Sequence, residues 1–511
     1  MKQKIIYVLL LLCFYQIPQY ANGVEKEKTR EASSQKDNVM SAAYWKLWNS
    51  DVQAKIDQDI DKNRKADAVL NLKELPAGTA ITVKQVSHDF LFGAHIFNFN
   101  QLGSNELNSK YKELYGTLFN SASIAFYWKT FEMQPNRPRF HEEYWDTEEY
   151  WNKVKEPKKE PHWRRPAPDP VVAFCKSKGI HLHGHTIIWG NRKWQNPEWI
   201  FDRFCPAEEK EKLNKLTKEE TEKLTPEQIE KLAPVYFKEM GRLFKKRITE
   251  LANYYGDKLD SWDVVNESSK DYHGNCVTGN AVCKSRYGWM PGDYPYQSFK
   301  IADIVFPHSV QFFINDYANN ENYANQVKDL IAHGCRINAM GSQMHLFNPQ
   351  QCLDIAAGKL IESPQQVWNK METISKAGLP IHLSEITITS PGEDERGLEI
   401  QAIIARNLYR LWFSIKPMMG ITWWNVVDDC GAPGEPSVSG LFTRDMKAKP
   451  SFYALDNLIN HEWKTNKTVI VGKDGIARFR GFKGRYVICW KNSAGEEQQT
   501  EFHLKKDGDG L

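Results

Sequence analysis

Leu259-Asp260-Ser261-Trp262-Asp263-Val264-Val265-Asn266-Glu267 has the pattern of a short buried β-strand that ends in an amide and a carboxylate. Trp262, Val264 and Val265 suit a packed, pleated surface, whereas Asn and Glu are poor strand formers. A carboxylate directly after an apolar run must be solvated, paired or functional, because burial of an unpaired charge costs several kcal/mol. Taken alone, the stretch is most simply a strand that ends at a polar loop.

A second stretch, Ile381-His382-Leu383-Ser384-Glu385, repeats this order of apolar strand and terminal glutamate 118 residues later. Between residues 88 and 455, apolar runs alternate with helical patterns. The strand candidates are 90–96, 121–126, 180–188, 259–265, 310–314, 338–343, 380–384 and 419–424, and the helical candidates include 235–255, 322–333, 364–377 and 397–415. Eight strands that alternate with helices predict an α/β fold of the (β/α)₈ TIM-barrel type. An open doubly wound sheet is the alternative, but no Gly-rich phosphate loop follows any of these strands.

The first 87 residues have a different organisation. Residues 1–23 have the form of a signal peptide, with a basic start, an apolar run from Ile5 to about Tyr15 and small residues up to Gly23. Residues 24–87 are expected to hold a charged leader, a helix over 44–66 and a hairpin of two strands, 68–72 and 80–86. We therefore expect an exported protein, placed outside the cell, in a periplasm or at the cell surface.

Residues 456–511 are expected to add short strands after the barrel. The candidates are 468–471, 477–482 with an interruption at Gly481, 485–490 and 501–504. Because these strands and the N-terminal hairpin would each leave an apolar sheet face uncovered alone, we expect them to form one small β-sandwich. For this appendage a structural role is favoured over glycan binding. Two charged insertions, 153–170 and 206–234, are expected to be solvated decorations of the barrel.

Composition narrows the partners of this 511-residue chain. A net charge of +3 supplies no argument for nucleic acid, and no segment after the signal peptide is apolar enough to cross a membrane. The chain has 17 Trp and 21 Tyr, whose faces suit sugar rings. Among nine cysteines, Cys276 and Cys283 are spaced for a local disulfide, with an unbridged pair as the equal alternative. No Cys/His spacing resembles a zinc site, and we expect no metal, no cofactor and a monomer.

Polar and aromatic residues follow the predicted strands at the points where a barrel brings its strand ends together. They are His183 to Trp189 on strand three, Asn266-Glu267 on strand four, Asn315-Asp316-Tyr317 on strand five, Gln343-Met344-His345 on strand six, Glu385 on strand seven and Trp423-Trp424-Asn425 on strand eight. A ring of this composition is typical of a carbohydrate site, and two glutamates are what a two-carboxylate glycosidase needs. For His185 and His345, a hydrogen-bonded core position is the alternative interpretation.

Several of these stretches resemble the motifs of one family. Trp262-Asp263-Val264-Val265-Asn266-Glu267 is similar to the acid/base motif of glycoside hydrolase family 10, the endo-β-1,4-xylanases. Similar to its other signatures are Gly184-His185-Thr186-Ile187-Ile188-Trp189, Asn315-Asp316-Tyr317, Gly341-Ser342-Gln343-Met344-His345 and Leu383-Ser384-Glu385. The resemblance covers roughly residues 85 to 455.

The resemblance implies a retaining hydrolase of the xylan backbone, in which Glu267 is the general acid/base and Glu385 the nucleophile. It implies that Asn266 hydrogen-bonds the sugar 2-hydroxyl and that His345 orients Glu385. The other substrate-binding residues that it implies are His185, Trp189, Gln343, Trp424 and Trp128. From charge alone, an ionised Glu385 is expected to raise the pKa of Glu267, so that Glu267 stays protonated until the glycosyl-enzyme forms.

Three departures from the family pattern concern the walls of the site. Where many members have Glu-Asn-x-Met-Lys-Trp, this chain has Ser123-Ile124-Ala125-Phe126-Tyr127-Trp128, followed by Glu132. Gly190 stands where a His is common, and Asp428-Asp429-Cys430-Gly431 lacks the usual Ser-Trp. We expect catalysis to be kept and sugar contacts away from the cleavage point to differ.

The alternatives that stay open are therefore hydrolysis of decorated xylo-oligosaccharides, hydrolysis of another β-linked glycan, and glycan binding on a scaffold that has lost catalysis. The presence of both glutamates in the context of Asn266 and His345 argues against the last.

Overall fold

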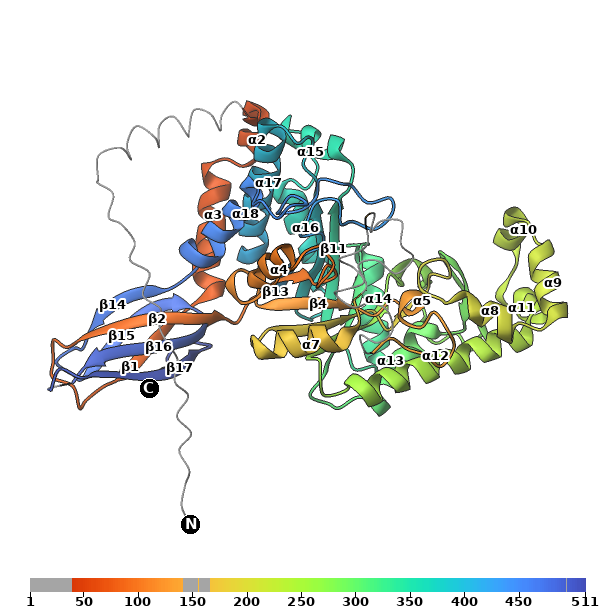
Figure 1. The fold of residues 1–511 in the computed structure, drawn as a ribbon, viewed down its shortest axis with the longest axis horizontal. Helices are drawn as coiled ribbons and strands as arrows, with labels where there is room; N and C mark the ends of the chain where they lie inside the picture. Colours follow the sequence, from red (N-terminus) through yellow and green to blue (C-terminus); the bar gives the residue numbers. More distant parts are fainter. Residues whose placement is uncertain (1–38, 141–154, 156–165, 493) are drawn as a thin grey trace, which may run out of the picture.

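The computed structural model describes residues 39–140, 155, 166–492 and 494–511 (Figure 1). The expected signal peptide, nearly all of the charged leader and most of the 153–170 insertion lie outside these residues. Within them, no helix combines the length and the apolar character needed to cross a membrane.

Eight parallel strands close into a barrel. In chain order they are β3 (Leu91–His95), β4 (Ser121–Ala125), β5 (His181–His185), β7 (Ser261–Asn266), β10 (Gln311–Asp316), β11 (Ala339–Leu346), β12 (Ile381–Ile388) and β13 (Met418–Trp423). Each pairs with the next, and β13 pairs with β3, so the sheet has no free edge apart from the short β6 (Ile188–Trp189) beside β7. The TIM-barrel prediction is confirmed, and the open doubly wound sheet is excluded.

The barrel strands are buried along both faces, as expected where helices cover a parallel sheet. The predicted helices 235–255, 322–333, 364–377 and 397–415 are confirmed to within two residues as α12 (Pro234–Tyr255), α14 (Glu321–Ala332), α16 (Pro364–Ser375) and α17 (Glu395–Ser414). The other helices of the barrel region are α4 (Asn105–Thr117), α5 (Trp128–Phe131), α7 (Pro168–Ser177), α13 (Tyr294–Val305), α15 (Pro349–Ala356) and α18 (Pro450–Asp456), with a 3₁₀ turn η3 (Ser269–Asp271) and a π-helical turn η4 (Asn457–Glu462).

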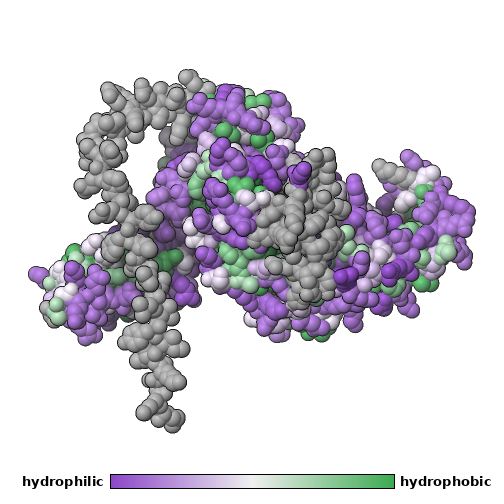
Figure 2. Space-filling view, in the orientation of Figure 1, coloured by the Kyte–Doolittle hydropathy of each residue, from purple (hydrophilic) through white to green (hydrophobic). Residues whose placement is uncertain are grey.

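The charged insertion before α12 is helical and projects from one end of the molecule (Figure 1). It consists of α9 (Ala207–Lys215), α10 (Lys218–Lys223) and α11 (Pro226–Leu232), and α8 (Glu198–Phe204) precedes it. Thr217 and Thr225 each form a capping box at the start of a helix, which satisfies the first free backbone N–H groups. The visible surface of the insertion is mainly hydrophilic (Figure 2), which agrees with the expected solvated decoration.

The appendage is a sandwich of two sheets built from both ends of the chain. β1 (Lys65–Asn71) pairs with β15 (Ile476–Phe482), and β2 (Ala80–His88) lies between β14 (Asn466–Ile470) and β16 (Gly484–Lys491), with β17 (Glu497–Leu504) outside β16. A shared apolar core joins the sheets, including Leu70, Val83, Phe479, Tyr486 and Leu504. The expected sandwich is therefore present.

Two details of the expected appendage were wrong. β1 and β2 do not form a hairpin, because the C-terminal segment supplies each with a different antiparallel partner and places them in opposite sheets. β15 is not interrupted at Gly481, where an added Cβ would lie 2.6 Å from the hydroxyl of Tyr486, so the glycine lets Tyr486 approach.

The helix expected over 44–66 is two helices, α2 (Ala42–Leu47) and α3 (Ser50–Arg64), because the Asn49 side chain accepts from two N–H groups and starts α3.

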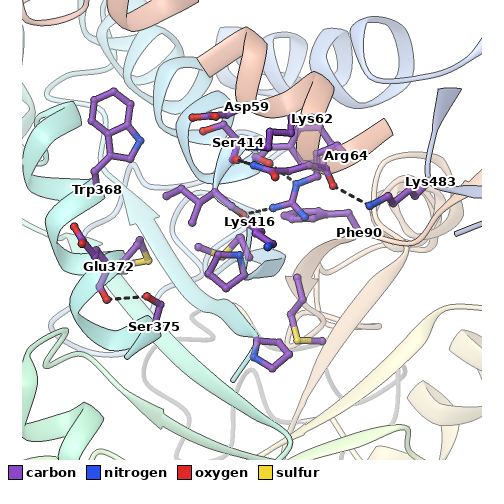
Figure 3. Close-up of a pocket in the computed structure, with 18 of the residues that line it drawn as sticks. Asp59, Lys62, Arg64, Phe90, Trp368, Glu372, Ser375, Ser414, Lys416 and Lys483 are labelled. Carbon is purple, nitrogen blue, oxygen red and sulfur yellow. Dashed lines mark hydrogen bonds between the residues drawn. The ribbon is translucent and has the colours of Figure 1, made fainter. Parts of the chain in front are cut away.

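A groove of about 1430 Å³ lies at the amino ends of the strands, between α3, α16 and the end of α17 (Figure 3). Polar side chains at the end of α3 hydrogen-bond to the end of α17 in this groove. Arg64 donates to the carbonyls of Phe413 and Ile415, and Asn63 donates to that of Ser414 at 2.8 Å. These are the last carbonyls of α17, which have no partner within their own helix. The groove is thus the seam between the N-terminal segment and the barrel.

We expect Arg64→Leu to lower the free energy of unfolding by about 1–3 kcal/mol, because the Phe413 carbonyl loses its donor and the Ile415 carbonyl keeps only the Met418 N–H. Urea unfolding followed by tryptophan fluorescence measures the change. The matched control is Arg478→Leu, which removes an exposed arginine paired with Asp474 and should change stability by less than about 0.5 kcal/mol. Equal losses in the two variants would contradict a stabilising role for the seam.

Candidate active site

The carboxyl ends of the barrel strands surround a cavity of about 710 Å³. Of the nine residues named from the sequence as catalytic or substrate-binding, eight line it: Glu267, Glu385, Asn266, His185, Trp189, Gln343, His345 and Trp424. These residues come from strands far apart in the chain, so the barrel has assembled them. The cavity lies at the opposite end of the strands from the groove of Figure 3.

Glu267 follows directly on β7 with a left-handed backbone, at φ +54°. This conformation is uncommon for residues other than glycine and costs about 1 kcal/mol or more, so the surroundings must hold it. Part of that support is a hydrogen bond of 2.7 Å from the Glu267 backbone N–H to the carbonyl of Asn315 on the neighbouring β10. The turn at this point ends the strand and leaves the side chain in the cavity.

The Gln343 side chain joins the two glutamates. Its amide nitrogen lies 3.2 Å from Glu267 Oε1 and 3.0 Å from Glu385 Oε1. These two carboxylate oxygens can therefore be separated by no more than the sum of the distances, about 6.2 Å. Both carboxyl groups can reach one glycosidic bond from this position.

Two β-bulges aim the strand-tip residues. Across β11 and β12, Ser342 faces Leu383 but the next residue, Gln343, faces Glu385, so the register skips one residue of β12. A similar shift between β10 and β7 brings Asn315 opposite Asn266. Bulges next to active sites commonly re-aim side chains in this way. Without these shifts the amides would be one position out of line with the residues that they bind.

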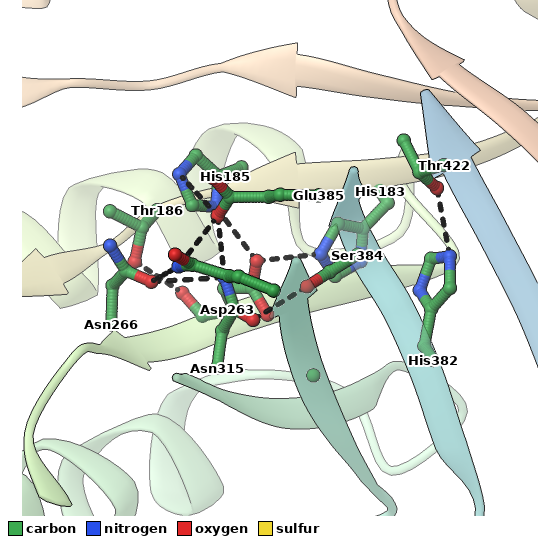
Figure 4. A network of polar contacts seen from close by, with 12 residues as sticks. His183, His185, Thr186, Asp263, Asn266, Asn315, His382, Ser384, Glu385 and Thr422 are labelled. Atoms are coloured by element: carbon green, nitrogen blue, oxygen red, sulfur yellow. Dashed lines mark hydrogen bonds and ion pairs between the residues drawn. The ribbon is translucent and has the colours of Figure 1, made fainter. Parts of the chain in front are cut away.

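A polar network surrounds Glu385 (Figure 4). Asn315 Nδ2 donates to Glu385 Oε1 at 2.7 Å and to Asn266 Oδ1 at 3.0 Å, and its own Oδ1 accepts from Ser384 at 2.6 Å. His345 Nε2 lies 3.5 Å from Glu385 Oε2, while its Nδ1 contacts the Thr387 hydroxyl at 2.9 Å. These contacts on both oxygens fix the orientation of the Glu385 carboxyl group.

Below this network, Asp263 is fully buried between His183 and His185 (Figure 4). Its Oδ2 lies 2.8 Å from His185 Nδ1 and 2.9 Å from His183 Nε2. Burial acts to raise the pKa of Asp263, but the two imidazoles outweigh it and hold the pKa well below its usual range. For His185, burial is outweighed by Glu385 and Asp263, so its pKa is raised. His185 faces Glu385, with its Nε2 3.7 Å from Glu385 Oε1.

The two glutamates have different environments. Burial, then the charges of Glu385 and Asp316, raise the pKa of Glu267 to about 8. Glu385 instead accepts from the Asn315 and Gln343 amides. At neutral pH Glu267 thus holds a proton, as expected for the acid of an acid and nucleophile pair.

With this geometry established, the family match is decisive. A model described as Glycosyl hydrolase family 10 matches residues 88–458, which is more than half of the chain. The chain belongs to glycosyl hydrolase family 10. The resemblance noted in the strand-end motifs is confirmed.

Curated relatives of this family 10 chain match at low identity. An endo-1,4-beta-xylanase C of Paenibacillus barcinonensis is 24% identical over 74% of this chain, and an endo-1,4-beta-xylanase A of Thermoanaerobacterium saccharolyticum is 26% identical over 56%. The chain spans 32% and 22% of the lengths of these two relatives. Among solved structures, xylanase B of Clostridium stercorarium F9 is 19% identical, with a TM-score of 0.48 over 72% of this chain and 96% of that one.

Trp128 is not where the resemblance implied. It is buried on α5 with 1% of its surface exposed, and its indole N–H donates to Glu132 at 2.8 Å. It packs among core aromatics such as Trp199 and Phe244, so it does not reach the cavity. The preceding residue, Tyr127, does line it, in edge contact with His185 at 5.3 Å.

Cysteines do not form the local bridge that their spacing allowed. All eight cysteines of the described residues are free. Cys283 lies in a strand that pairs with Met290, whereas Cys276 faces Asp329 and His333. The side chains of Cys276, Asp329 and His333 place their possible metal-ligand atoms within 4.8 Å of one another. His333 Nδ1 also lies 2.9 Å from the carbonyl of Asp329, so that nitrogen carries a proton and offers no lone pair to a metal.

Several residues in or beside the cavity were not given a role from the sequence. Arg286, Tyr287, Tyr317 and Glu435 line the cavity. Asn315 does not line it but donates to Glu385. Asn315 and Tyr317 both belong to the strand-end motif Asn315-Asp316-Tyr317 that was quoted from the sequence, which assigned neither a role. Arg286, Tyr287 and Glu435 lie in loops whose fold has no periodic sequence signal.

The raised pKa of Glu267 predicts a pH-dependent stability. The unfolded side chain has a pKa of about 4.3, so between that pH and about 8 the folded protein holds the extra proton. The linked stability is complete below about pH 4.3 and is lost as the pH rises through 8. We therefore compare the free energy of unfolding of Glu267→Gln with that of the unsubstituted protein. We expect this difference to shift in favour of the variant by on the order of a few kcal/mol between about pH 5 and about pH 9, because only the unsubstituted protein loses the linked stability.

Urea unfolding at the two pH values measures this difference. Glu74→Gln, at an exposed position in the appendage, is the control, and its difference from the unsubstituted protein should not change over the interval. A pH-independent difference for Glu267→Gln would mean that Glu267 is ionised throughout, and would remove the proposed asymmetry of the two carboxyls.

Proposed function

We propose that this protein is an exported, retaining endo-β-1,4-xylanase that hydrolyses the xylan backbone by double displacement. One observation carries the mechanism: a protonated Glu267 and a carboxylate Glu385 share the Gln343 amide, with those oxygens at most about 6.2 Å apart. Retaining glycosidases separate their carboxyl groups by about 5–5.5 Å and inverting ones by about 6.5–9.5 Å, so the bound favours retention. Xylan as substrate is supported by the names of the curated relatives.

In the first step, Glu385 attacks the anomeric carbon while Glu267 gives its proton to the leaving glycosidic oxygen. The Asn315 and Gln343 amides fix the attacking oxygen of Glu385, and His345 lies beside its other oxygen. The bond between sugar and leaving group breaks, and an ester between Glu385 and the sugar forms. No step requires a group beyond these side chains and water.

In the second step, water replaces the departed sugar. Esterification removes the negative charge of Glu385, which is one of the causes of the raised pKa of Glu267. The pKa of Glu267 therefore falls, and Glu267, a carboxylate since it gave up its proton, takes a proton from the water. That water attacks the anomeric carbon, and the ester bond to Glu385 breaks and leaves Glu385 as a carboxylate. The same residue thus serves as acid and then as base, because its neighbour changes charge.

The cavity walls supply the sugar contacts. Asn266 is placed beside Glu385 through Asn315, where its amide can meet a sugar hydroxyl. Trp424 packs edge-on to His185 at 5.4 Å, and Trp189 lines the same cavity. Aromatic faces of this kind cover the apolar faces of sugar rings. Export from the cell is proposed from the N-terminal pattern of residues 1–23, and the acting form is proposed to be a monomer.

We expect Glu385→Ala to reduce the release of reducing sugar from xylan by at least about 10⁴-fold, because the attacking group is lost. The matched control is Glu372→Ala, an exposed glutamate in the seam groove, which should keep full activity. Proton NMR of the first products should show the β-anomer, since two displacements retain the configuration. An α-anomer as first product would contradict the double displacement.

A panel of xylan, β-glucan and mannan, with sizing of the products, tests the substrate. Cleavage of xylan into a ladder of oligosaccharides supports the endo-xylanase. Preferential cleavage of another polymer would replace xylan by that β-linked glycan while keeping the mechanism. Binding to a polymer without any cleavage, at the same level in Glu385→Ala, would show a glycan-binding protein.

A further inference from the structure

A hairpin after η3 forms part of the cavity wall beside Glu267. It consists of β8 (Val282–Ser285) and β9 (Gly288–Pro291), paired in antiparallel register. The two residues of its turn, Arg286 and Tyr287, both line the cavity that holds Glu267 and Glu385. The hairpin therefore brings a cation and an aromatic ring to the centre of the proposed chemistry.

The hairpin packs closely against the backbone of Gly190. An added Cβ at Gly190 would lie 2.5 Å from the hydroxyl of Tyr294 and 2.7 Å from that of Ser285, so any larger residue would displace them. In the available space, Ser285 donates to the Gly190 carbonyl at 2.6 Å. Asp271 accepts from the Arg286 backbone N–H and from the Tyr294 hydroxyl, both at 2.7 Å. The position of the turn is thus fixed by polar contacts, of which the one between Ser285 and Gly190 is buried.

The Arg286 side chain lies between two aromatic rings. Its guanidinium carbon is 5.0 Å from the ring centre of Tyr287 and 5.3 Å from that of Tyr317. Lys270 adds a second cation, with its Nζ 4.9 Å from the ring centre of Tyr317. Such contacts restrict a guanidinium to one region while leaving its N–H groups free for a further partner.

Neither Arg286 nor Lys270 forms an ion pair in the part of the chain that the structure describes, although the charge of Lys270 acts on the buried Asp316. The ion pairs found there include none to Arg286 or Lys270, and both residues are exposed to solvent. The neighbouring Asp271 accepts its hydrogen bonds from a backbone N–H and a tyrosine hydroxyl instead. An arginine that is positioned by rings, open to the cavity and unpaired is ready to bind an anion.

The hairpin turn lies on the side of the cavity where Glu267 is found. Tyr287 is close enough for the charge of Glu267, after burial, to raise its pKa, and its ring is 6.3 Å from that of Trp189. His185 and Trp424 instead pack together beside Glu385. Because the general acid protonates the leaving-group oxygen, residues gathered around Glu267 face the leaving group and what is attached to it.

We propose that Arg286, held between Tyr287 and Tyr317, binds the carboxylate of a uronic acid substituent on the leaving-group part of the substrate. The inference rests on the proposed function and specifies it, because it directs the hydrolase to an acidic, decorated chain. A carboxylate is planar and accepts two parallel N–H groups from the guanidinium fork. Lys270 supplies additional positive charge at the same tyrosine.

The test compares glucuronoxylan with the same polymer after reduction of its carboxyl groups to primary alcohols, which keeps the substitution pattern and removes the charge. We expect kcat/KM to be about tenfold higher on the charged polymer, the typical effect of one charge-assisted hydrogen bond. Arg286→Gln should bring the ratio of the two values close to one. The matched control Arg203→Gln, at an exposed arginine of α8, should keep the ratio of the unsubstituted protein.

The outcomes separate this inference from the proposed function. Equal kcat/KM on both polymers, or a ratio that Arg286→Gln leaves unchanged, overturns the carboxylate site while xylan hydrolysis stands. Absence of cleavage of both polymers and of linear xylo-oligosaccharides overturns the proposed function itself. A ratio that falls equally in Arg203→Gln assigns the effect to net charge and also overturns the site.

Discussion

One amide sets the conditions for the rest of the site. Gln343 donates toward Glu267 and Glu385 at 3.2 and 3.0 Å, so the two carboxyl groups face each other in a buried cavity. Two carboxylates at this separation repel each other, and protonation of one of them removes the repulsion. Burial and the charge of Glu385 place that proton on Glu267. Asn315 and His345, on its two oxygens, then orient the Glu385 carboxyl group.

This arrangement depends on register as much as on the barrel. The barrel brings the carboxyl ends of its strands to one mouth, but successive strand residues point to opposite faces. The bulge between β11 and β12 omits Ser384 from the pairing and puts Gln343 opposite Glu385. The Ser384 hydroxyl donates to Asn315 Oδ1 and so orients the amide that binds Glu385. The irregularity is therefore part of how the carboxyl pair is built.

The sequence predicted the parts of the molecule that have a periodic or terminal signal. Apolar runs located all eight barrel strands, and the polar residues at their ends located the two glutamates and the residues around them. Trp128 was misplaced because a motif shows which residues are near and not which way they point; here Glu132 takes the indole N–H into the core. The partner of β1 was missed because alternation shows that a strand has a buried face but not which strand pairs with it.

The departures from the family motifs have a common physical meaning. Tyr127 stands where many members have Lys, and it lines the cavity as an aromatic wall beside His185. Gly190 stands where a His is common, and its missing side chain leaves room for the Ser285 hydroxyl of the hairpin. Both changes alter the loops and walls and leave the strand-end carboxyls and their donors in place. Because loops tolerate change that a packed barrel does not, the chain can acquire a new substrate preference without disturbing Glu267 and Glu385.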